Sequence, residues 1–340
     1  MEIALAHSLV AVTDPSQPSA ARVAARSVAS QAAFDEEDGY RAGIVATELA
    51  TNLVKHAVAG EVLVRKLRGA PGGEIEILAI DRGPGMIDVA SCLADGHSTT
   101  GTPGNGLGAV RRLADDFEVH SQQGRGTVVM VRLRSKRQAR LPPPMLEAGV
   151  VSVAKSGETV CGDAWQVQHS VDGALLVVAD GLGHGLYAAE ASKAAIEAVN
   201  LRHPQSLQDR LQTMHDALRH TRGAAAALAD VRVKSGVIAF AGVGNIAGSI
   251  VMPDTVRHTV SSNGTLGHHA VRFREYSYPW DPAALFVMAS DGLASHWSLD
   301  DHQGLRYRHP ALIAAVLYRD YSRQRDDVTV LVVREPTTVQ

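Results

Sequence analysis

Helical and strand-like spacings of apolar residues alternate along the first third of the chain. Apolar residues recur every three to four positions over residues 40–59, as in a helix with one buried face, and residues 19–33 form an alanine-rich run of the same kind. Apolar and polar residues instead alternate over residues 61–67 and 74–80, which predicts a hairpin across the glycine-rich turn at residues 69–73. The remaining predicted elements are a helix and two strands, at residues 107–114, 117–120 and 127–133. This order predicts an α/β sandwich with helices on one face of a sheet.

The rest of the chain is richer in short strands. Strands are predicted at residues 150–154, 165–169, 174–179, 236–241, 246–252, 257–260, 271–276, 285–289 and 328–333. Helices are predicted at residues 186–201, 207–220 and 312–318. Many antiparallel strands with clustered helices predict an α+β architecture of two sheets flanked by helices.

A run of prolines separates these two patterns. Pro142, Pro143 and Pro144 cannot continue a helix or a central strand. We therefore predict two domains, over residues 1–138 and 147–340, joined by a basic, proline-rich linker at residues 139–146. The basic stretch before the prolines lacks interleaved aromatic residues, so a solvated linker is favoured over a nucleic-acid patch.

Composition gives no indication of a nucleic-acid or membrane partner. The length of 340 residues suits two domains, and 33 basic against 36 acidic residues leave a charge of −3, which forces neither a nucleic-acid nor a lipid partner. Cys92 and Cys161 have neither disulfide-framework nor zinc-site spacing, which favours a reducing cytoplasm. No apolar run reaches the ~20 residues of a membrane span, and the N-terminus lacks a signal-peptide pattern. We expect a cytoplasmic protein with a small-molecule or protein ligand.

Polar residues and glycine loops in the first domain predict an ATP site. Glu48 and Asn52 share one face of the predicted helix at residues 40–59, with His56 one turn further on. Asp81 opens a loop of sequence Asp-Arg-Gly-Pro-Gly-Met directly after a strand, and a second glycine-rich loop at residues 101–108 precedes a helix. A strand-end carboxylate can accept a hydrogen bond from an adenine amino group, and backbone amides at a helix N-terminus favour phosphate.

The helix supplies the remaining chemistry of that site. The Asn52 oxygen suits a Mg²⁺ ion that already holds the phosphates, and Glu48 could deprotonate an incoming hydroxyl. Taken singly, these features also fit a turn, a flexible connection and a solvated helix face. Their order along the chain favours the ATP site, which is neither a Walker A loop nor a Rossmann fingerprint.

Residues 1–135 resemble the GHKL (HATPase) superfamily, which includes gyrase, sensor histidine kinases and the anti-sigma-factor serine kinases. Residues 48–56 look like its N box, residues 81–86 its first glycine box and residues 99–108 its lid and second glycine box, while residues 124–127 match the turn that supports the adenine-binding aspartate. The resemblance implies a Bergerat-type fold with serine/threonine kinase activity, because no helix carrying a phosphorylatable histidine is present. It implies that ATP and Mg²⁺ are bound by Asn52, His56, Asp81, Gly83, Gly85, Met86, Thr100, Gly104, Gly106, Leu107, Gly108 and Thr127.

Acidic residues in the second domain predict a metal site. Aspartates occur at the ends of predicted apolar strands, at Asp163, Asp180, Asp291 and the pair Asp326 and Asp327. A single Asp-Gly is usually a turn, but four instances at strand ends can converge on one rim. Such hard oxygen ligands suit Mg²⁺ or Mn²⁺, and two ions of this kind can activate a water and hold phosphate oxygens.

Residues 146–335 resemble the SpoIIE branch of the metal-dependent type 2C protein phosphatases, through residues 157–163, 180–185, 290–292 and 325–330. The resemblance implies two Mn²⁺ or Mg²⁺ ions held by Asp163, Asp180, the Gly181 carbonyl, Asp291 and Asp326, with Asp180 and Asp291 as catalytic residues and Asp327 as a neighbour of less certain role. His184 is either a general acid or a residue that caps or packs the next helix. His268 and His269 fit a surface loop, and the phosphate-gripping arginine of many relatives has no obvious match.

Together the two resemblances imply a bifunctional regulatory enzyme. The first domain would phosphorylate a protein serine or threonine with Glu48 as base, and the second would hydrolyse the phosphoester. The expected substrates are STAS-domain proteins of a stressosome or anti-sigma partner-switching pathway, with another regulatory phosphatase or sigma-pathway protein as a further partner. An alternative is that the first domain binds ATP and a partner as a switch for the phosphatase, with little kinase activity. A histidine-kinase fragment is a weaker third hypothesis.

Overall fold

The computed structural model describes residues 2–3, 6–67, 73–93, 106–136, 144–200, 206–268 and 272–336. The chain divides into two compact units, each built from segments that are not contiguous in sequence. The N-terminal unit contains residues 7–141 and 298–319. The C-terminal unit contains residues 1–6, 142–297 and 320–340.

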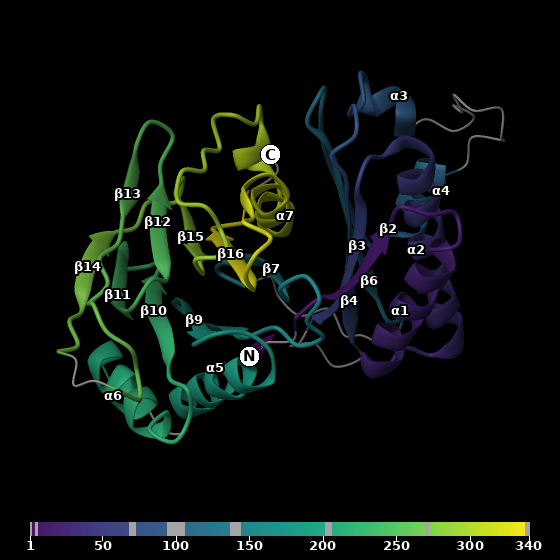
Figure 1. The fold of residues 1–340 in the computed structure, drawn as a ribbon. Coiled ribbons are helices and arrows are strands. Elements are labelled where there is room, and N and C mark those ends of the chain that lie inside the picture. The colour runs from purple at the N-terminus through teal and green to yellow at the C-terminus, as the bar shows by residue number, and fades with distance from the viewer. Residues whose placement is uncertain are drawn as a thin grey trace. The chain divides into compact units, whose positions relative to one another are not determined.

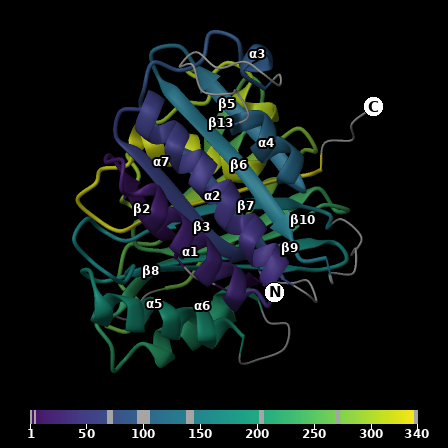
Figure 2. The ribbon, with the colours of Figure 1, turned by 90° about the vertical axis from the view of Figure 1, so that its right-hand side faces the viewer.

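The N-terminal unit is a five-stranded antiparallel sheet with helices on one face (Figure 1). The strand order is β2 (Ser8–Val12), β3 (Gly60–Leu67), β4 (Glu74–Ile80), β6 (Gly126–Arg134) and β5 (Asp116–Gln122). The helices from the first part of the chain are α1 (Pro18–Gln31), α2 (Glu36–His56), α3 (Val89–Leu93) and α4 (Gly106–Leu113). Figure 2 shows α1 and α2 side by side across the sheet. The layered α/β sandwich predicted from sequence is confirmed.

Small residues allow the two long helices to lie close together on the sheet. The buried face of α1 carries Ala21, Ala25 and Ala29, and the core they join includes alanines, Val45 and Leu49 of α2. Asp35 caps α2, because its side chain accepts a hydrogen bond from the Asp38 backbone N–H. Acidic residues in the first turn and Lys55 and His56 in the last match the helix dipole.

The other face of this sheet carries a buried ionic network. Glu76 is fully buried and accepts hydrogen bonds from Arg65 at 2.8 Å and Arg132 at 2.9 Å. Burial alone would raise the pKa of Glu76, but the two arginines outweigh it and hold that pKa well below its usual range. The segment at residues 298–319, which includes most of α7 (Pro310–Tyr321), lies in this unit. The Tyr318 hydroxyl donates to Glu61 on β3 at 3.0 Å.

The C-terminal unit is a sandwich of two antiparallel sheets with helices outside (Figure 1). The first sheet has the order β1 (Glu2–Ile3), β8 (Asp163–His169), β9 (Gly173–Gly181), β10 (Ala224–Arg232), β11 (Val237–Val243) and β14 (Tyr276–Pro279). The second has the order β13 (Val256–His258), β12 (Ala247–Val251), β15 (Leu285–Ala289), β16 (Val328–Arg334) and β7 (Glu147–Val153). The core between them contains Trp165, Phe240 and Phe286. Helices α5 (Leu186–Val199) and α6 (Leu207–Ala217) pack on the first sheet.

The structure corrects three details of the predicted elements. Strand β10 was not predicted, because its sequence Ala-Ala-Ala-Ala-Leu-Ala-Asp-Val-Arg favours a helix by local propensity. It lies between β9 and β11, where small side chains let α5 and α6 approach the sheet. Strand β2 was also missed, and the strand expected at residues 271–276 lies at Tyr276–Pro279, because alternation alone does not fix where a strand ends. No helix among the described residues is long and apolar enough to cross a membrane.

Candidate functional sites

The first candidate site begins on the polar side of α2. Glu48 and Asn52 are both partly exposed, and the first residue of α4, Gly106, lies beside them. A Cβ atom added to Gly106 would lie 3.2 Å from Asn52 Oδ1 and 3.7 Å from Glu48 Oε2. Because Gly106 has no side chain, the N-terminus of α4 can lie close to the Glu48 carboxylate and the Asn52 amide. Such an N-terminus attracts phosphate.

Asp81 stands at the end of β4 and is held by the backbone around it. Its carboxylate accepts a hydrogen bond from the Gly83 N–H at 2.6 Å, and its own N–H donates to the Thr127 carbonyl at 2.9 Å. Burial raises the pKa of Asp81, although the backbone hydrogen bonds work against the increase. The position suits a carboxylate that recognises a donor such as an exocyclic amino group.

The glycines of the loop after β4 permit backbone contacts that a side chain would block. A Cβ atom on Gly83 would lie 2.9 Å from the His56 carbonyl oxygen, at the end of α2. Gly85 has φ +72°, and a Cβ there would lie 2.3 Å from the carbonyl oxygen of Gln122. The neighbouring Met86 N–H donates to Ser121 Oγ at 2.7 Å.

Thr127 contacts both ends of the loop at residues 81–86, directly at Asp81 and through Ser121 at Met86. Its hydroxyl is 2.9 Å from Ser121 Oγ, so β5, β6 and the loop at residues 81–86 form one hydrogen-bonded assembly. The sequence did not indicate Ser121, because nothing in its neighbourhood distinguishes it from any other polar residue of a strand.

The α2 helix connects the two ends of the first site. Glu48 and Asn52 lie beside Gly106, and His56 lies beside Gly83. The eight residue steps from Glu48 to His56 span about 12 Å of helix. Further along α4, Leu107 packs against the core and Gly108 is buried. Thr100 and Gly104, both predicted to contact ATP, lie outside the described residues.

The second candidate site is an acidic cluster in the C-terminal unit. Asp163 on β8 and Asp180 on β9 are directly paired in the antiparallel ladder. Ser290 Oγ donates to Asp163 Oδ2 at 2.7 Å, while Asp163 Oδ1 is buried and has no hydrogen-bond partner among the described residues. The neighbouring Gly181 N–H donates to the Gly162 carbonyl at 3.2 Å. The pairing places the two aspartates together, as their strand-end positions predicted.

The remaining aspartates come from loops that follow β15 and precede β16. Asp291 accepts a hydrogen bond from Asn245 Nδ2 at 2.7 Å, a contact that the sequence did not indicate. Asp326 accepts from the Asp327 N–H at 3.0 Å, and Asp327 Oδ1 accepts from the Lys155 N–H at 2.9 Å. Asp327 Oδ2 is buried without a partner among the described residues.

Gly162 is required for the close approach of Asp327. A Cβ atom on Gly162 would lie 2.6 Å from Asp327 Oδ2. Asp327 is therefore anchored from both sides, by the Lys155 backbone and by contact with residue 162.

Burial and mutual repulsion make this cluster hold protons in the absence of a cation. Burial raises the pKa of Asp163 to about 7, although the hydrogen bond from Ser290 works against the increase. Burial, followed by the neighbouring carboxylates, raises the pKa of Asp180 to about 8. Burial also raises the pKa of Asp291 and Asp327. Crowded carboxylates with unpartnered buried oxygens fit hard divalent cations, which relieve the repulsion.

The geometry limits how such a cation is held. No three carboxylate, imidazole or thiol groups within the described part of the chain surround a common point at metal-binding distances. Mg²⁺ commonly completes its ligand set with water and phosphate oxygens. Asp163, Asp180, Asp291, Asp326 and the Gly181 carbonyl are the groups on hand.

The histidines near this cluster are engaged elsewhere. His184 Nδ1 is 2.5 Å from Glu158 Oε1, in the turn that leads into α5. This contact orients the imidazole without deciding between a general acid and a structural role. His268 lies in an exposed turn with Nε2 2.8 Å from the Arg222 carbonyl oxygen, and His269 lies outside the described residues.

The first third of the chain and its second half resemble separate groups of known proteins. A family model for histidine kinase-like ATPase domains matches residues 11–133, and one for stage II sporulation protein E (SpoIIE) matches residues 170–336. The chain is 38% identical over 112 residues to the serine/threonine-protein kinase RsbT of Bacillus subtilis (strain 168), covering 32% of this chain and 83% of RsbT. It is 23% identical over 145 residues to the phosphoserine phosphatase RsbX of the same strain, covering 42% of this chain and 73% of RsbX.

A solved structure resembles this chain in fold. The crystal structure of RsbX in complex with magnesium aligns with a TM-score of 0.50 and 19% identity, covering 58% of this chain and 98% of that one. An alignment over that share of the chain, together with the sandwich of two sheets and flanking helices, confirms the type 2C phosphatase fold predicted for the second domain.

Proposed function

Because the chain belongs to the histidine kinase-like ATPase family through residues 11–133 and carries a SpoIIE-type phosphatase domain over residues 170–336, we propose that it both adds and removes phosphate on a regulatory protein. It is a regulator of the partner-switching type, with a kinase-like domain and a type 2C phosphatase domain on one polypeptide. The proposed substrates are serine or threonine residues of STAS-domain proteins. The proposed setting is the cytoplasm, in keeping with Cys92 and Cys161, which are both free thiols.

The observation that best supports the kinase half is the approach of Gly106 to Glu48 and Asn52. ATP with Mg²⁺ would supply the phosphoryl group. Within this chain, Glu48 would accept the proton of the incoming hydroxyl, and Asn52 Oδ1 would hold the Mg²⁺. Asp81 would accept a hydrogen bond from the adenine amino group. Transfer of the hydroxyl proton to Glu48 makes the oxygen a nucleophile without other covalent chemistry by the protein.

The paired Asp163 and Asp180 support the phosphatase half. Two Mg²⁺ or Mn²⁺ ions would supply an activated water and neutralise the phosphate oxygens. The roles of the chain are to present oxygen ligands and to orient them. Ser290 orients Asp163 and Asn245 orients Asp291, each through a hydrogen bond to one carboxylate oxygen. The relatedness to the phosphoserine phosphatase RsbX supports a phosphoserine substrate.

Phosphate transfer from radiolabelled ATP tests this proposal directly. The purified chain would be incubated with STAS-domain proteins from the same organism, and the Asp180→Asn variant would be compared with wild type. We expect label to accumulate on a STAS protein with Asp180→Asn, and to be removed by wild type when Mn²⁺ is present. Asn52→Ala, which loses the proposed Mg²⁺ ligand, serves as the control that should not transfer label.

The outcomes separate kinase from switch. Label that never reaches a STAS protein, even with Asp180→Asn, would refute kinase activity. If ATP still binds in that case, the first domain is a nucleotide-dependent switch for the phosphatase. Labelled STAS protein that wild type cannot dephosphorylate in Mn²⁺ would refute the phosphatase half.

A further inference from the structure

An arginine lies against the loop that leaves the acidic cluster. This loop, at residues 182–185, follows β9, whose last residue, Gly181, supplies a candidate metal ligand. A Cβ atom on Gly183 would lie 3.0 Å from a terminal guanidinium nitrogen of Arg222, so the guanidinium packs against that glycine. Gly183 has φ +92°, which residues with a side chain rarely adopt. Two residue steps, at most about 7 Å of chain, separate Gly183 from Gly181.

The backbone that carries Arg222 is held to the same loop. In the ladder of β9 and β10, Ala224 pairs with Gly181. The Leu182 N–H also donates to the Gly223 carbonyl at 3.0 Å. Sheet pairing therefore fixes the start of β10 beside the loop, and the position of Arg222 does not depend on its long side chain alone.

Stacking on a tyrosine orients the guanidinium without neutralising it. The Arg222 guanidinium carbon lies 5.0 Å from the centre of the ring of Tyr187, a residue in the first turn of α5. Both residues are exposed. Among the residues that the structure describes, no carboxylate lies within ion-pair distance of Arg222. Its charge is therefore available to an anion that reaches the loop from solvent.

Two other basic side chains near the cluster are engaged with carboxylates. His184 Nδ1 is 2.5 Å from Glu158 Oε1. Arg323 lies close enough to Asp291 for its positive charge to work against the raised pKa of that carboxyl. Arg222 differs from both, because its guanidinium stacks on an aromatic ring instead of approaching a carboxylate.

We propose that Arg222 binds the phosphoryl group of the substrate at the phosphatase site, through oxygens that the divalent ions leave open. The inference rests on the proposed phosphatase function and adds a substrate contact to it. A planar guanidinium can donate two parallel N–H bonds to one phosphate group, and stacking on a ring leaves its edge open for them. The sequence offered no candidate for this role, because Arg222 reaches the loop only through the pairing of β9 with β10.

The contact also favours one class of phosphoester. A phosphoserine or phosphothreonine monoester carries three acceptor oxygens besides the ester oxygen. A phosphodiester has one fewer to share between the divalent ions and the guanidinium. Arg222 should therefore increase the preference of the site for monoesters over diesters, and its removal should reduce that preference.

Binding of inorganic phosphate tests the contact without turnover. Calorimetric titrations in Mg²⁺ would compare wild type with Arg222→Gln, Arg222→Lys and Tyr187→Leu. We expect Arg222→Gln to bind phosphate about ten-fold more weakly and Arg222→Lys to recover part of the loss. Tyr187→Leu, which removes the stacking ring, should weaken binding by about three-fold. The affinity for Mg²⁺ itself should be the same in all four proteins.

Turnover then measures the preference between substrates. With a phosphoserine peptide, KM should rise by about ten-fold for Arg222→Gln. The ratio of kcat/KM for p-nitrophenyl phosphate to that for bis(p-nitrophenyl) phosphate should fall in the same variant. A residue that only supported the fold would lower both activities together and leave this ratio unchanged.

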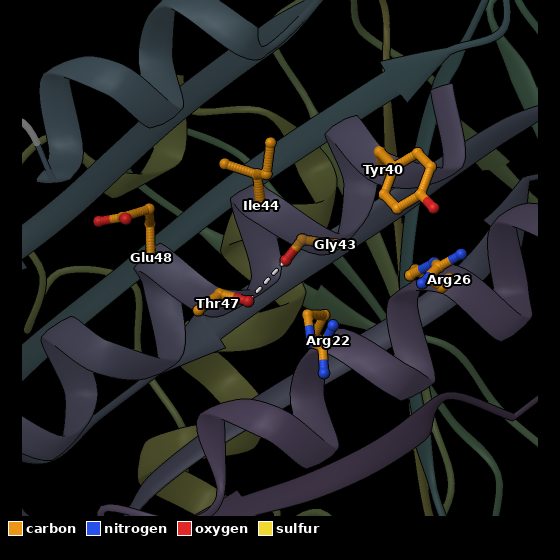
Figure 3. Close-up of a pocket in the computed structure, with 7 residues that line it drawn as sticks. All are labelled: Arg22, Arg26, Tyr40, Gly43, Ile44, Thr47 and Glu48. Atoms are coloured by element: carbon orange, nitrogen blue, oxygen red, sulfur yellow. Dashed lines mark hydrogen bonds between the residues drawn. The ribbon is translucent and has the colours of Figure 1, made fainter. Parts of the chain in front are cut away.

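The matched control is Arg26→Gln in the N-terminal unit. The Arg26 guanidinium also stacks on a tyrosine, with its carbon 4.5 Å from the centre of the Tyr40 ring (Figure 3). This variant removes an exposed, stacked arginine far along the chain from the acidic cluster, and it should bind phosphate like wild type.

Several outcomes would overturn the contact. Phosphate affinity that is equal in Arg222→Gln and wild type would do so, and so would a wild type that binds no phosphate in Mg²⁺. A parallel loss of Mg²⁺ and phosphate affinity would show that Arg222 supports the cluster instead of binding the substrate. If phosphate binding responds as expected but no phosphoserine peptide is hydrolysed, the contact stands and the phosphatase proposal fails.

Discussion

Removing divalent ions should make the stability of the C-terminal unit fall as pH rises. In the folded chain without metal, burial and neighbouring carboxylates raise the pKa of Asp163 from 3.8 to about 7. An unfolded chain releases this proton near pH 4, so the folded state binds more protons between about pH 4 and 7. The free energy of unfolding must decrease as pH rises through that window.

The size of the effect follows from the same pKa difference. A difference of about three between the folded and unfolded pKa of Asp163 corresponds to roughly 4 kcal/mol in the free energy of unfolding for this residue alone. Asp180, with a pKa raised to about 8, extends the loss toward pH 8. Because the two aspartates share one cluster, their contributions overlap and should not be added. Mn²⁺ or Mg²⁺ replaces the protons, so stability at pH 7.5 should recover when the ion is returned.

Tryptophan fluorescence can follow this unit alone. Trp165, Trp280 and Trp297 are the three tryptophans of the chain, and all lie in the C-terminal unit. Urea unfolding would be measured from pH 5 to 8 in EDTA and again in Mn²⁺, for wild type and Asp163→Asn. The control is Asp254→Asn, which removes an exposed carboxylate of the same unit.

The slope with pH is the decisive quantity. We expect a steep decrease for wild type and Asp254→Asn in EDTA, and a shallower one for Asp163→Asn. A stability that is constant or increases from pH 5 to 8 in EDTA would refute the argument. An Asp163→Asn slope equal to that of wild type would show that another group carries the protons.

Three further results are expected in the rest of the chain. Gly85→Ala should abolish ATP-analogue binding measured by calorimetry, because a Cβ would lie 2.3 Å from the Gln122 carbonyl oxygen; unchanged affinity would contradict the loop geometry. Glu76→Gln should reduce the free energy of unfolding followed by circular dichroism by about 3–5 kcal/mol, since two arginines lose their buried partner; a loss below about 1 kcal/mol would mean that water enters the network. In native protein, a thiol reagent should modify partly exposed Cys92 well before Cys161, which is buried and whose pKa is raised by burial; equal rates would contradict that burial.

The sequence identified the acidic and glycine residues better than it identified their supports. Asp81, Asp163 and Asp180 could be found because each follows or begins a predicted strand, and strand ends gather on one edge. The sequence could not show that Ser121, Asn245 and Ser290 form hydrogen bonds that support the site residues. Their partners are remote in sequence and come together only through sheet pairing and loop packing.

The fold itself was predictable where periodicity is strong. The 21-residue α2 and the hairpin of β3 and β4 follow from helical and alternating patterns. The β10 strand was not predictable, since alanines have no strand signature and only its place between β9 and β11 makes it a strand. The membership of residues 298–319 in the N-terminal unit was equally hidden, because local sequence carries no record of long-range packing.

Each unit contains a segment from the other side of the proline run, which affects how the chain can be divided into fragments. A cut at the proline run would leave residues 7–141 without the segment at 298–319. Glu61 would then lose its hydrogen bond from Tyr318, which lies in that segment. The other fragment would lack residues 1–6, whose strand β1 pairs with β8. A division at that point would therefore separate packing partners in both units, and each fragment should be less stable than the same unit in the intact chain.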